Sequence, residues 1–215
     1  MNAHKYKIDL HVHSHESGDN DADPEEVVER AIERGLDGIA FTEHYSYGAS
    51  EQAERLREKY GRALLIFRGV EFSAREGHCL VFGADTDRLG LKDAPMHEVV
   101  RVVNEAGGVV IPSHPYRGGG TGAGDLVLYL AGIAALEGCN GVNLAAMNLK
   151  AIETARSLGL PHTGGSDAHE PRDVGSCYTE FEDAVTLTNL VGLLRQGRYR
   201  GVDVRKVSRA PLPSW

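Results

Sequence analysis

Cysteine is scarce in this sequence: only Cys79, Cys139 and Cys177 occur among 215 residues, far apart and without a C-x-x-C pair. This argues against a thiolate zinc site and a disulfide framework, and favours a reducing compartment. Long apolar runs are also missing, since nowhere are 18 apolar residues consecutive and the N-terminus has no signal-peptide core. We therefore expect a cytoplasmic protein with no membrane partner.

Positive charge is not in excess either, because the formal net charge is −8. Proteins that bind nucleic acid non-specifically carry a basic stripe, so this class is disfavoured, except where a short or single-stranded end is the substrate. A small phosphorylated substrate is compatible with the charge, because bound metal ions would make the site locally positive.

No proline- or serine-rich linker and no internal repeat divides the chain. We expect a single domain over residues 1–215, with residues 210–215 as a loose tail. A core of this size folds without a structural metal, so any bound metal is expected to serve chemistry.

Short apolar runs alternate with helical segments along the chain. The pattern predicts strands over 6–12, 36–42, 64–72, 79–82, 109–112, 133–137 and 160–165, and helices over 24–34, 50–60, 96–106, 144–158 and 184–196. Such alternation predicts a parallel sheet. Six or seven units in this length indicate a small α/β barrel, with a doubly wound open sheet as the alternative.

Most of the histidines, together with two carboxylates, follow the ends of these predicted strands. In chain order they are His11, His13, His15, His44, Glu71, His78, His114, Asp167 and His169. In parallel α/β architectures, ligand sites are built at the carboxyl ends of the strands. We therefore expect these side chains to converge.

The spacing of His11-Val-His13 predicts that both imidazoles face the same way, because residues two apart on a strand point to one face. Asp167-x-His169 repeats this spacing with a carboxylate. Imidazole and carboxylate donors without thiolate suit zinc, manganese or iron. Eight or nine ligands are too many for one ion, so we expect two or three divalent ions sharing a bridging carboxylate.

These residues resemble the motifs of the PHP superfamily, named for polymerase and histidinol phosphatase. The matching segments are Asp9-Leu-His11-Val-His13, Thr42-Glu43-His44, Gly69-Val-Glu71, Gly77-His78, Ser113-His114-Pro115 and Gly165-Ser166-Asp167-Ala168-His169. The short length and the last motif are most similar to the stand-alone phosphoesterases of the family.

The resemblance implies a distorted (β/α)7 barrel with a trinuclear metal site at the carboxyl-terminal face of its strands. Carried over by position, the first ion would bind His11, His13, Glu71 and Asp167; the second Glu71, His78 and His114; and the third His44, His169 and one loop residue. The loop departs from the common family pattern, and Asp19 is our first choice for that ligand and His15 the second. Glu43, where the family usually has Asp, is expected to orient a ligand histidine.

The expected reaction is hydrolysis of a small phosphate ester, a nucleotide or a sugar phosphate, by a metal-activated hydroxide. Asp167 or a ligand histidine is expected to move a proton, and Arg117 and Arg172 to clamp phosphate oxygens.

Three rival functions remain. Amide hydrolysis on a related barrel often needs a bridging lysine on a central strand, and none of the six lysines ends a middle strand. A metal-binding module without turnover would be expected to have lost ligands. A nuclease acting on single-stranded ends would be expected to carry an aromatic and basic track.

Overall fold

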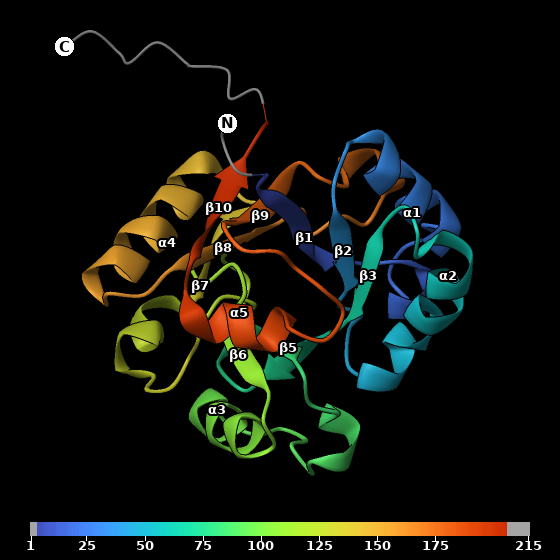
Figure 1. The fold of residues 1–215 in the computed structure, drawn as a ribbon. Helices are drawn as coiled ribbons and strands as arrows, with labels where there is room; N and C mark the ends of the chain where they lie inside the picture. The colour runs from blue at the N-terminus through green and yellow to red at the C-terminus, as the bar shows by residue number, and fades with distance from the viewer. Residues whose placement is uncertain (1–3, 206–215) are drawn as a thin grey trace, which may run out of the picture.

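The computed structural model describes residues 4–205, which form a ring of strands with helices around it (Figure 1). The strands are β1 (Tyr6–Val12), β2 (Gly38–Phe41), β3 (Leu65–Arg68), β4 (Val70–Ala74), β5 (Gly77–Phe82), β6 (Val109–Pro112), β7 (Leu136–Asn140), β8 (His162–Gly165), β9 (Cys177–Phe181) and β10 (Tyr199–Asp203). The α-helices are α1 (Pro24–Glu33), α2 (Gln52–Tyr60), α3 (Met96–Glu105), α4 (Ala145–Ser157) and α5 (Leu190–Gln196). None of the described helices is long and apolar enough to span a bilayer.

The strands belong to three sheets. The largest has the order β10-β9-β1-β2-β3, the second β4-β5-β6, and the third pairs β7 with β8. The predicted α/β class is confirmed, but the expectation of parallel pairing throughout is wrong. The pairs β1–β2, β2–β3 and β7–β8 are parallel, whereas β9, β10 and the whole second sheet pair antiparallel. The described strands do not close into a continuous barrel, so the distorted (β/α)7 barrel stays a prediction.

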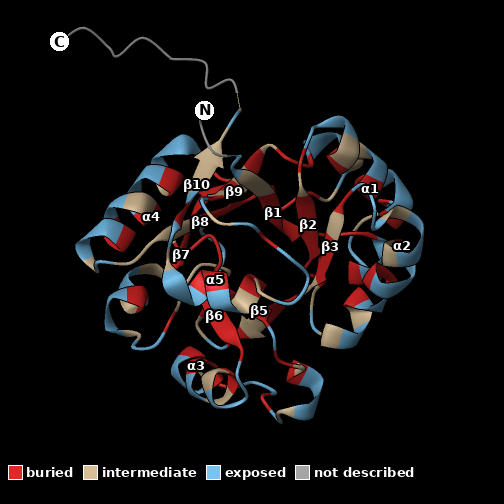
Figure 2. Cartoon of the chain, viewed as in Figure 1, coloured by how far each residue is buried: buried red, intermediate tan, exposed pale blue. Residues whose placement is uncertain are grey.

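Helix α1 shows how the sequence builds the outer layer. Asp23 caps it by accepting hydrogen bonds from the backbone N–H groups of Glu25 and Glu26, and Pro24 occupies the first turn. Its buried residues Val27, Val28 and Ala31 pack in one apolar cluster with β2. Figure 2 shows the same division across the molecule, with buried strands and helices that are exposed on their outer faces.

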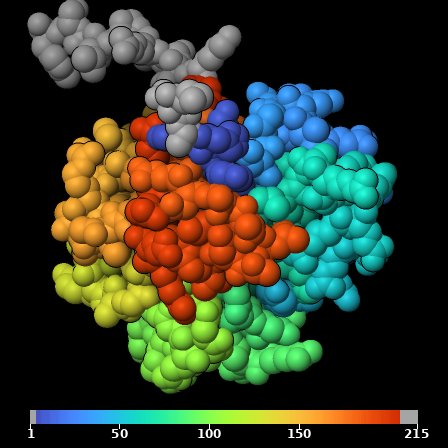
Figure 3. Space-filling model, viewed as in Figure 1, coloured from blue at the N-terminus to red at the C-terminus, as the bar shows by residue number. Residues whose placement is uncertain are grey.

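Helix α5 packs against the amino-terminal end of several strands. Its leucines 190, 193 and 194 pack with Ile8 and Val109, which lie near the starts of β1 and β6. The orange and red segment that contains α5 covers the front of the space-filling view (Figure 3). The carboxyl ends of these strands therefore open on the other side of the molecule.

Two predicted elements differ from the structure for local reasons. The strand expected over 64–72 is divided at Gly69 into β3 and β4, which belong to different sheets. A Cβ atom at Gly69 would lie 2.6 Å from Cε1 of Phe82, so the close approach of this ring requires glycine. The helix expected from residue 184 begins only at Leu190, because the Asn189 side chain accepts from the backbone of Thr186 and forms a turn there.

Gly165, the last residue of β8, lies directly against β1. A Cβ atom there would lie 2.3 Å from Cβ of His11. We expect Gly165→Ala to lower the free energy of unfolding by about 3 kcal/mol, because neither strand can yield. Gly192→Ala, in exposed α5 with nothing within 4 Å, should instead raise it by about 0.5–1 kcal/mol. Denaturant unfolding of both variants checks this, and an unchanged Gly165→Ala protein would contradict the close packing of β8 on β1.

Candidate metal centre

The first group of candidate ligands gathers around the end of β1. His11 lies in this strand and His13 directly follows its last residue, Val12, and both imidazoles are buried. Asp167 reaches them because its backbone N–H donates to the carbonyl of His11 at 2.7 Å. Nε2 of His11 and of His13 lie 3.4 and 3.3 Å from Oδ1 of Asp167, and 3.4 and 3.5 Å from Oε2 of Glu71. The ligand atoms of these four residues all lie within 4.8 Å of one another.

Glu71 presents its other oxygen to a second group. Its Oε1 lies 2.7 Å from Nε2 of His114 and 3.3 Å from Nδ1 of His78, and it accepts a hydrogen bond from Ser113 at 2.8 Å. Strand β4 carries Glu71 and its partner β5 carries His78, so antiparallel pairing brings them together. The three residues expected to share a second ion thus lie side by side.

The third group lies nearer to solvent. Oδ2 of Asp19 is 3.2 Å from Nε2 of both His44 and His169. The rings of these two histidines each stack on His13 with centroids 4.4 Å apart. His15 is not brought to this group: its Nε2 lies 3.6 Å from Glu16 and its side chain is 47% exposed. Of the two loop residues that the sequence offered, the structure therefore brings Asp19 to the histidines.

The donor set fits divalent metal ions. Among residues 4–205, four buried histidine nitrogens have no hydrogen-bond partner: Nε2 of His11, Nε2 of His13, Nδ1 of His44 and Nδ1 of His114. Buried polar atoms are rarely left unpaired, because each one costs about 1–3 kcal/mol. Imidazole nitrogen and carboxylate oxygen are the donors that zinc, manganese and iron accept.

The electrostatics of the cluster also favour a cation. Burial opposes ionisation of Asp167 and Glu71, but the charge of His11 and hydrogen bonds from the surrounding histidines together hold the pKa of both carboxyl groups well below its usual range. Burial likewise opposes protonation of His11, but the charges of Asp167, Glu137 and Glu71 raise its pKa well above the usual value. In contrast, burial lowers the pKa of His13 to about 4. The two charged carboxylates thus require positive charge, which a metal ion would supply.

Glu137 is a site residue that sequence reasoning missed. It is fully buried at β7, with Oε1 2.8 Å from Nδ1 of His11 and Oε2 accepting the backbone N–H of His114 at 2.7 Å. Because a carboxylate only accepts, Nδ1 of His11 carries a proton, and in the neutral imidazole, the form that binds a metal, Nε2 would keep its lone pair toward the cluster. The signal was available, since Glu137 ends a predicted strand as the other candidates do.

Glu43 is connected to the candidate ligand His13 through a serine. Its carboxylate accepts from the hydroxyl groups of Ser14 and Ser17 and from the Gln52 side chain. Ser17 Oγ in turn lies 3.0 Å from Nδ1 of His13. The expected orienting role of Glu43 therefore runs through Ser17, which the sequence did not single out.

Asp9 organises the loop after β8 from within the core. Its carboxylate accepts the backbone N–H groups of Ser166 at 2.8 Å and Gly175 at 2.9 Å. Burial raises its pKa to about 6, although these hydrogen bonds oppose the shift. Asp9 shares a face with the two histidines of β1 but ties two chain segments together beneath them.

The two arginines expected to clamp phosphate differ in position. Nη2 of Arg117 donates to Oδ2 of Asp167 at 2.6 Å and to Oδ1 of Asn140 at 2.7 Å. The prediction for Arg172 is not supported, because its guanidinium pairs with Glu170 at 2.6 Å and its side chain is 75% exposed. Only Arg117 lies beside the cluster.

Comparisons with known proteins agree with this site. Residues 9–112 match the PHP domain family, and residues 146–199 match the PHP-associated family. The first match contains His11, His13, His44, Glu71 and His78, and it ends two residues before His114.

Three solved structures share the fold. PsfC from Pseudomonas syringae superposes with a TM-score of 0.68 at 21% identity, over 94% of this chain and 92% of that one. A two-domain protein from Bacteroides vulgatus, containing a predicted PHP-like metal-dependent phosphoesterase, gives 0.69 at 22%, over 93% and 65%. The lesion-specific endonuclease PfuEndoQ from Pyrococcus furiosus gives 0.65 at 17%, over 92% and 58%. At these identities the likeness establishes the fold alone, and the chain spans only part of the last two proteins.

Proposed function

Because the chain belongs to the PHP superfamily, we propose that it is a metal-dependent phosphoesterase that hydrolyses a small phosphate ester. One observation carries the proposal: Glu71 turns Oε2 toward His11 and His13, and Oε1 toward His78 and His114. A carboxylate between two sets of imidazoles is suited to bridge two ions, as binuclear phosphoesterase sites require. We extend the proposal to one unit over residues 1–215, built as a distorted barrel.

The ligands would divide into three sets, of which the first two share Glu71. The first is His11, His13, Glu71 and Asp167, whose ligand atoms lie within 4.8 Å of one another. By their distances to a shared carboxylate, the second is Glu71, His78 and His114, and the third is His44, His169 and Asp19. Divalent ions held there would lower the pKa of a water molecule and neutralise charge on the phosphoryl oxygens. Zinc, manganese and iron all suit these donors.

The chain's own residues would orient the reactants. Arg117 and Asn140 both donate to Oδ2 of Asp167, at 2.6 and 3.1 Å, which leaves Oδ1 facing His11 and His13. The carboxylate is thereby fixed in one orientation, with Oδ1 presented to the first ligand set. The Arg117 guanidinium also brings a positive charge next to the cluster, where it can pair with a non-bridging phosphate oxygen.

A cavity of about 490 Å³ adjoins the third ligand set. Its walls include Asp19, Asn20, Asp21, Glu26, His169 and Glu170. This size suits a small molecule. The carboxylates of this cavity would repel the many phosphates of a nucleic acid strand more than the single phosphate of a compact ester, which favours the small ester.

Nuclease activity is the second candidate, because an endonuclease shares the fold at a TM-score of 0.65. The acidic cavity and the net charge of −8 weigh against it. A metal-binding module without turnover is the third candidate. The cavity beside the ligands weighs against it, because a module that binds no substrate needs no such cavity.

Elemental analysis of the purified protein, paired with turnover of a panel of phosphate esters in the presence of manganese, tests the proposal. The panel should hold nucleoside monophosphates, nucleoside bisphosphates, sugar phosphates and a single-stranded oligonucleotide. We expect two to three ions per chain, and turnover of a small ester that a chelator stops and manganese restores. A protein that binds no metal would overturn the proposal, and a fully metallated protein inert toward the panel would favour the module without turnover.

A further inference from the structure

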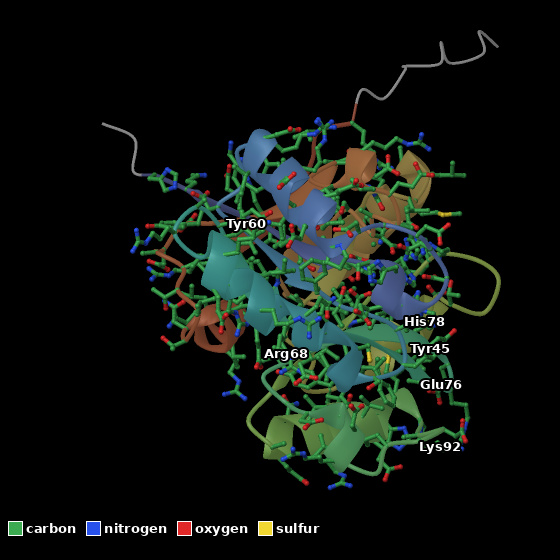
Figure 4. All side chains as sticks on the ribbon, turned by 90° about the vertical axis from the view of Figure 1, so that its right-hand side faces the viewer. Tyr45, Tyr60, Arg68, Glu76, His78 and Lys92 are labelled. Atoms are coloured by element: carbon green, nitrogen blue, oxygen red, sulfur yellow. The ribbon has the colours of Figure 1, made fainter. Side chains whose placement is uncertain are left out.

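Tyr45 follows the candidate ligand His44 and is 75% exposed. Figure 4 places its side chain on the same side of the molecule as His78. Its ring centroid lies 5.5 Å from that of the His44 imidazole, tilted by 43°. A large aromatic ring thus stands in solvent at the edge of the cluster.

The backbone at Tyr45 is strained. Its φ is +68°, and the N–H of Ser46 donates to the carbonyl of His44 at 2.8 Å, which closes a three-residue turn around Tyr45. This turn is rare and costly for a residue with a side chain. Only three other non-glycine residues within 4–205 have positive φ, and two of them, His114 and Asp167, belong to the cluster. Backbone strain is therefore concentrated at the site, as is common where strain serves function.

Neighbouring contacts hold the turn from both sides. Before it, His44 bridges to Glu71 of β4. After it, the Asp87 carboxylate accepts from the hydroxyl of Ser46 at 2.8 Å and from the backbone of Tyr47 and Gly48 at 3.0 and 2.9 Å. Burial of the Tyr45 side chain does not stabilise the turn, because most of this side chain is exposed to solvent. The strained turn, stabilised by its neighbours, therefore places an exposed aromatic ring beside His44.

We propose that Tyr45 is a specificity-determining residue whose ring stacks on a planar group in the leaving alcohol of the ester. The substrates are then nucleoside or aryl phosphates, and not phosphates of alcohols that carry no planar ring, such as glycerol. This inference rests on the proposed function. In the hydrolysis, water oxygen bonds to phosphorus, the bond from phosphorus to the leaving oxygen breaks, and that oxygen takes a proton. Tyr45 takes part in none of these changes and contributes only stacking, which accepts any planar ring.

The test compares kcat/KM of the manganese-loaded protein for adenosine monophosphate, 4-nitrophenyl phosphate and glycerol phosphate. We expect Tyr45→Gly to lower kcat/KM about tenfold for the two aromatic esters and to leave glycerol phosphate unchanged. Tyr45→Phe keeps the ring and should retain the wild-type values. Tyr129→Ala removes another tyrosine, 82% exposed in the 3-10 helix Gly124–Tyr129, and should change nothing.

Glycine suits the turn, so Tyr45→Gly should unfold at no lower temperature than the wild type, which separates lost stacking from lost fold. Equal losses on all three esters would mean that Tyr45 positions His44, and unchanged values would mean that it touches no substrate; either overturns the inference. Wild-type turnover of glycerol phosphate alone would also overturn it while leaving the proposed function intact. A wild-type protein that cleaves no phosphate ester overturns both.

Discussion

Glu71→Gln is expected to reduce turnover on the order of a thousandfold and to lower the metal content to one ion per chain or fewer. The amide keeps the shape of the side chain but loses the charge that faces histidines on both sides. The loss should exceed the roughly 10–100-fold typical for residues that act through a ligand, because Glu71 would itself bind two ions. Elemental analysis and turnover with excess manganese measure both effects.

A matched control is Glu105→Gln at the end of α3. Glu105 is exposed and pairs with Arg101 at 2.9 Å, and such surface pairs contribute less than about 1 kcal/mol. Its metal content and turnover should equal those of the wild type. If Glu71→Gln keeps its full complement of ions, then Glu71 is not the bridge and the ligand sets must be divided differently.

The sequence predicted those site residues whose positions follow directly from the geometry of a strand. His11 and His13 lie two apart at the carboxyl end of β1, which His13 directly follows, and Asp167 follows a strand whose end meets β1. The convergence of Glu71 and His78 was expected for a different reason from the one observed. Both were assigned to the ends of parallel units, whereas β4 and β5 bring them together by antiparallel pairing.

What the sequence did not predict depends on contacts between distant segments. Ser17 belongs to no motif, and its role appears only where its hydroxyl joins Glu43 to His13. The position of Glu137 at a strand end was a signal, but its partner His11 lies 126 residues away on β1. Strand β9 alternates buried and half-buried residues, a strand signal that was overlooked. This alternation does not predict that β9 pairs antiparallel with β1, because parallel and antiparallel strands show the same alternation.

Glu137→Gln is expected to weaken metal binding about 10–100-fold and to reduce turnover by a similar factor when metal is limiting. The single side-chain oxygen of glutamine can accept from only one of the two donors, Nδ1 of His11 or the backbone N–H of His114. Its NH2 group would then face the other donor, with which it cannot form a hydrogen bond. One ligand histidine would lose its orientation. Metal titration with a competing chelator, followed by turnover at each metal concentration, measures the change.

The response to excess manganese separates the two glutamates. Glu137 lies behind His11 and is fully buried, so it would touch neither ion nor substrate. Saturating metal should therefore restore most of the turnover of Glu137→Gln, because weaker binding is overcome by mass action. No such rescue is expected for Glu71→Gln, whose missing charge belongs to the site itself. Failure of metal to rescue Glu137→Gln would mean that the orientation or basicity of His11 matters to the chemistry after the ions are bound.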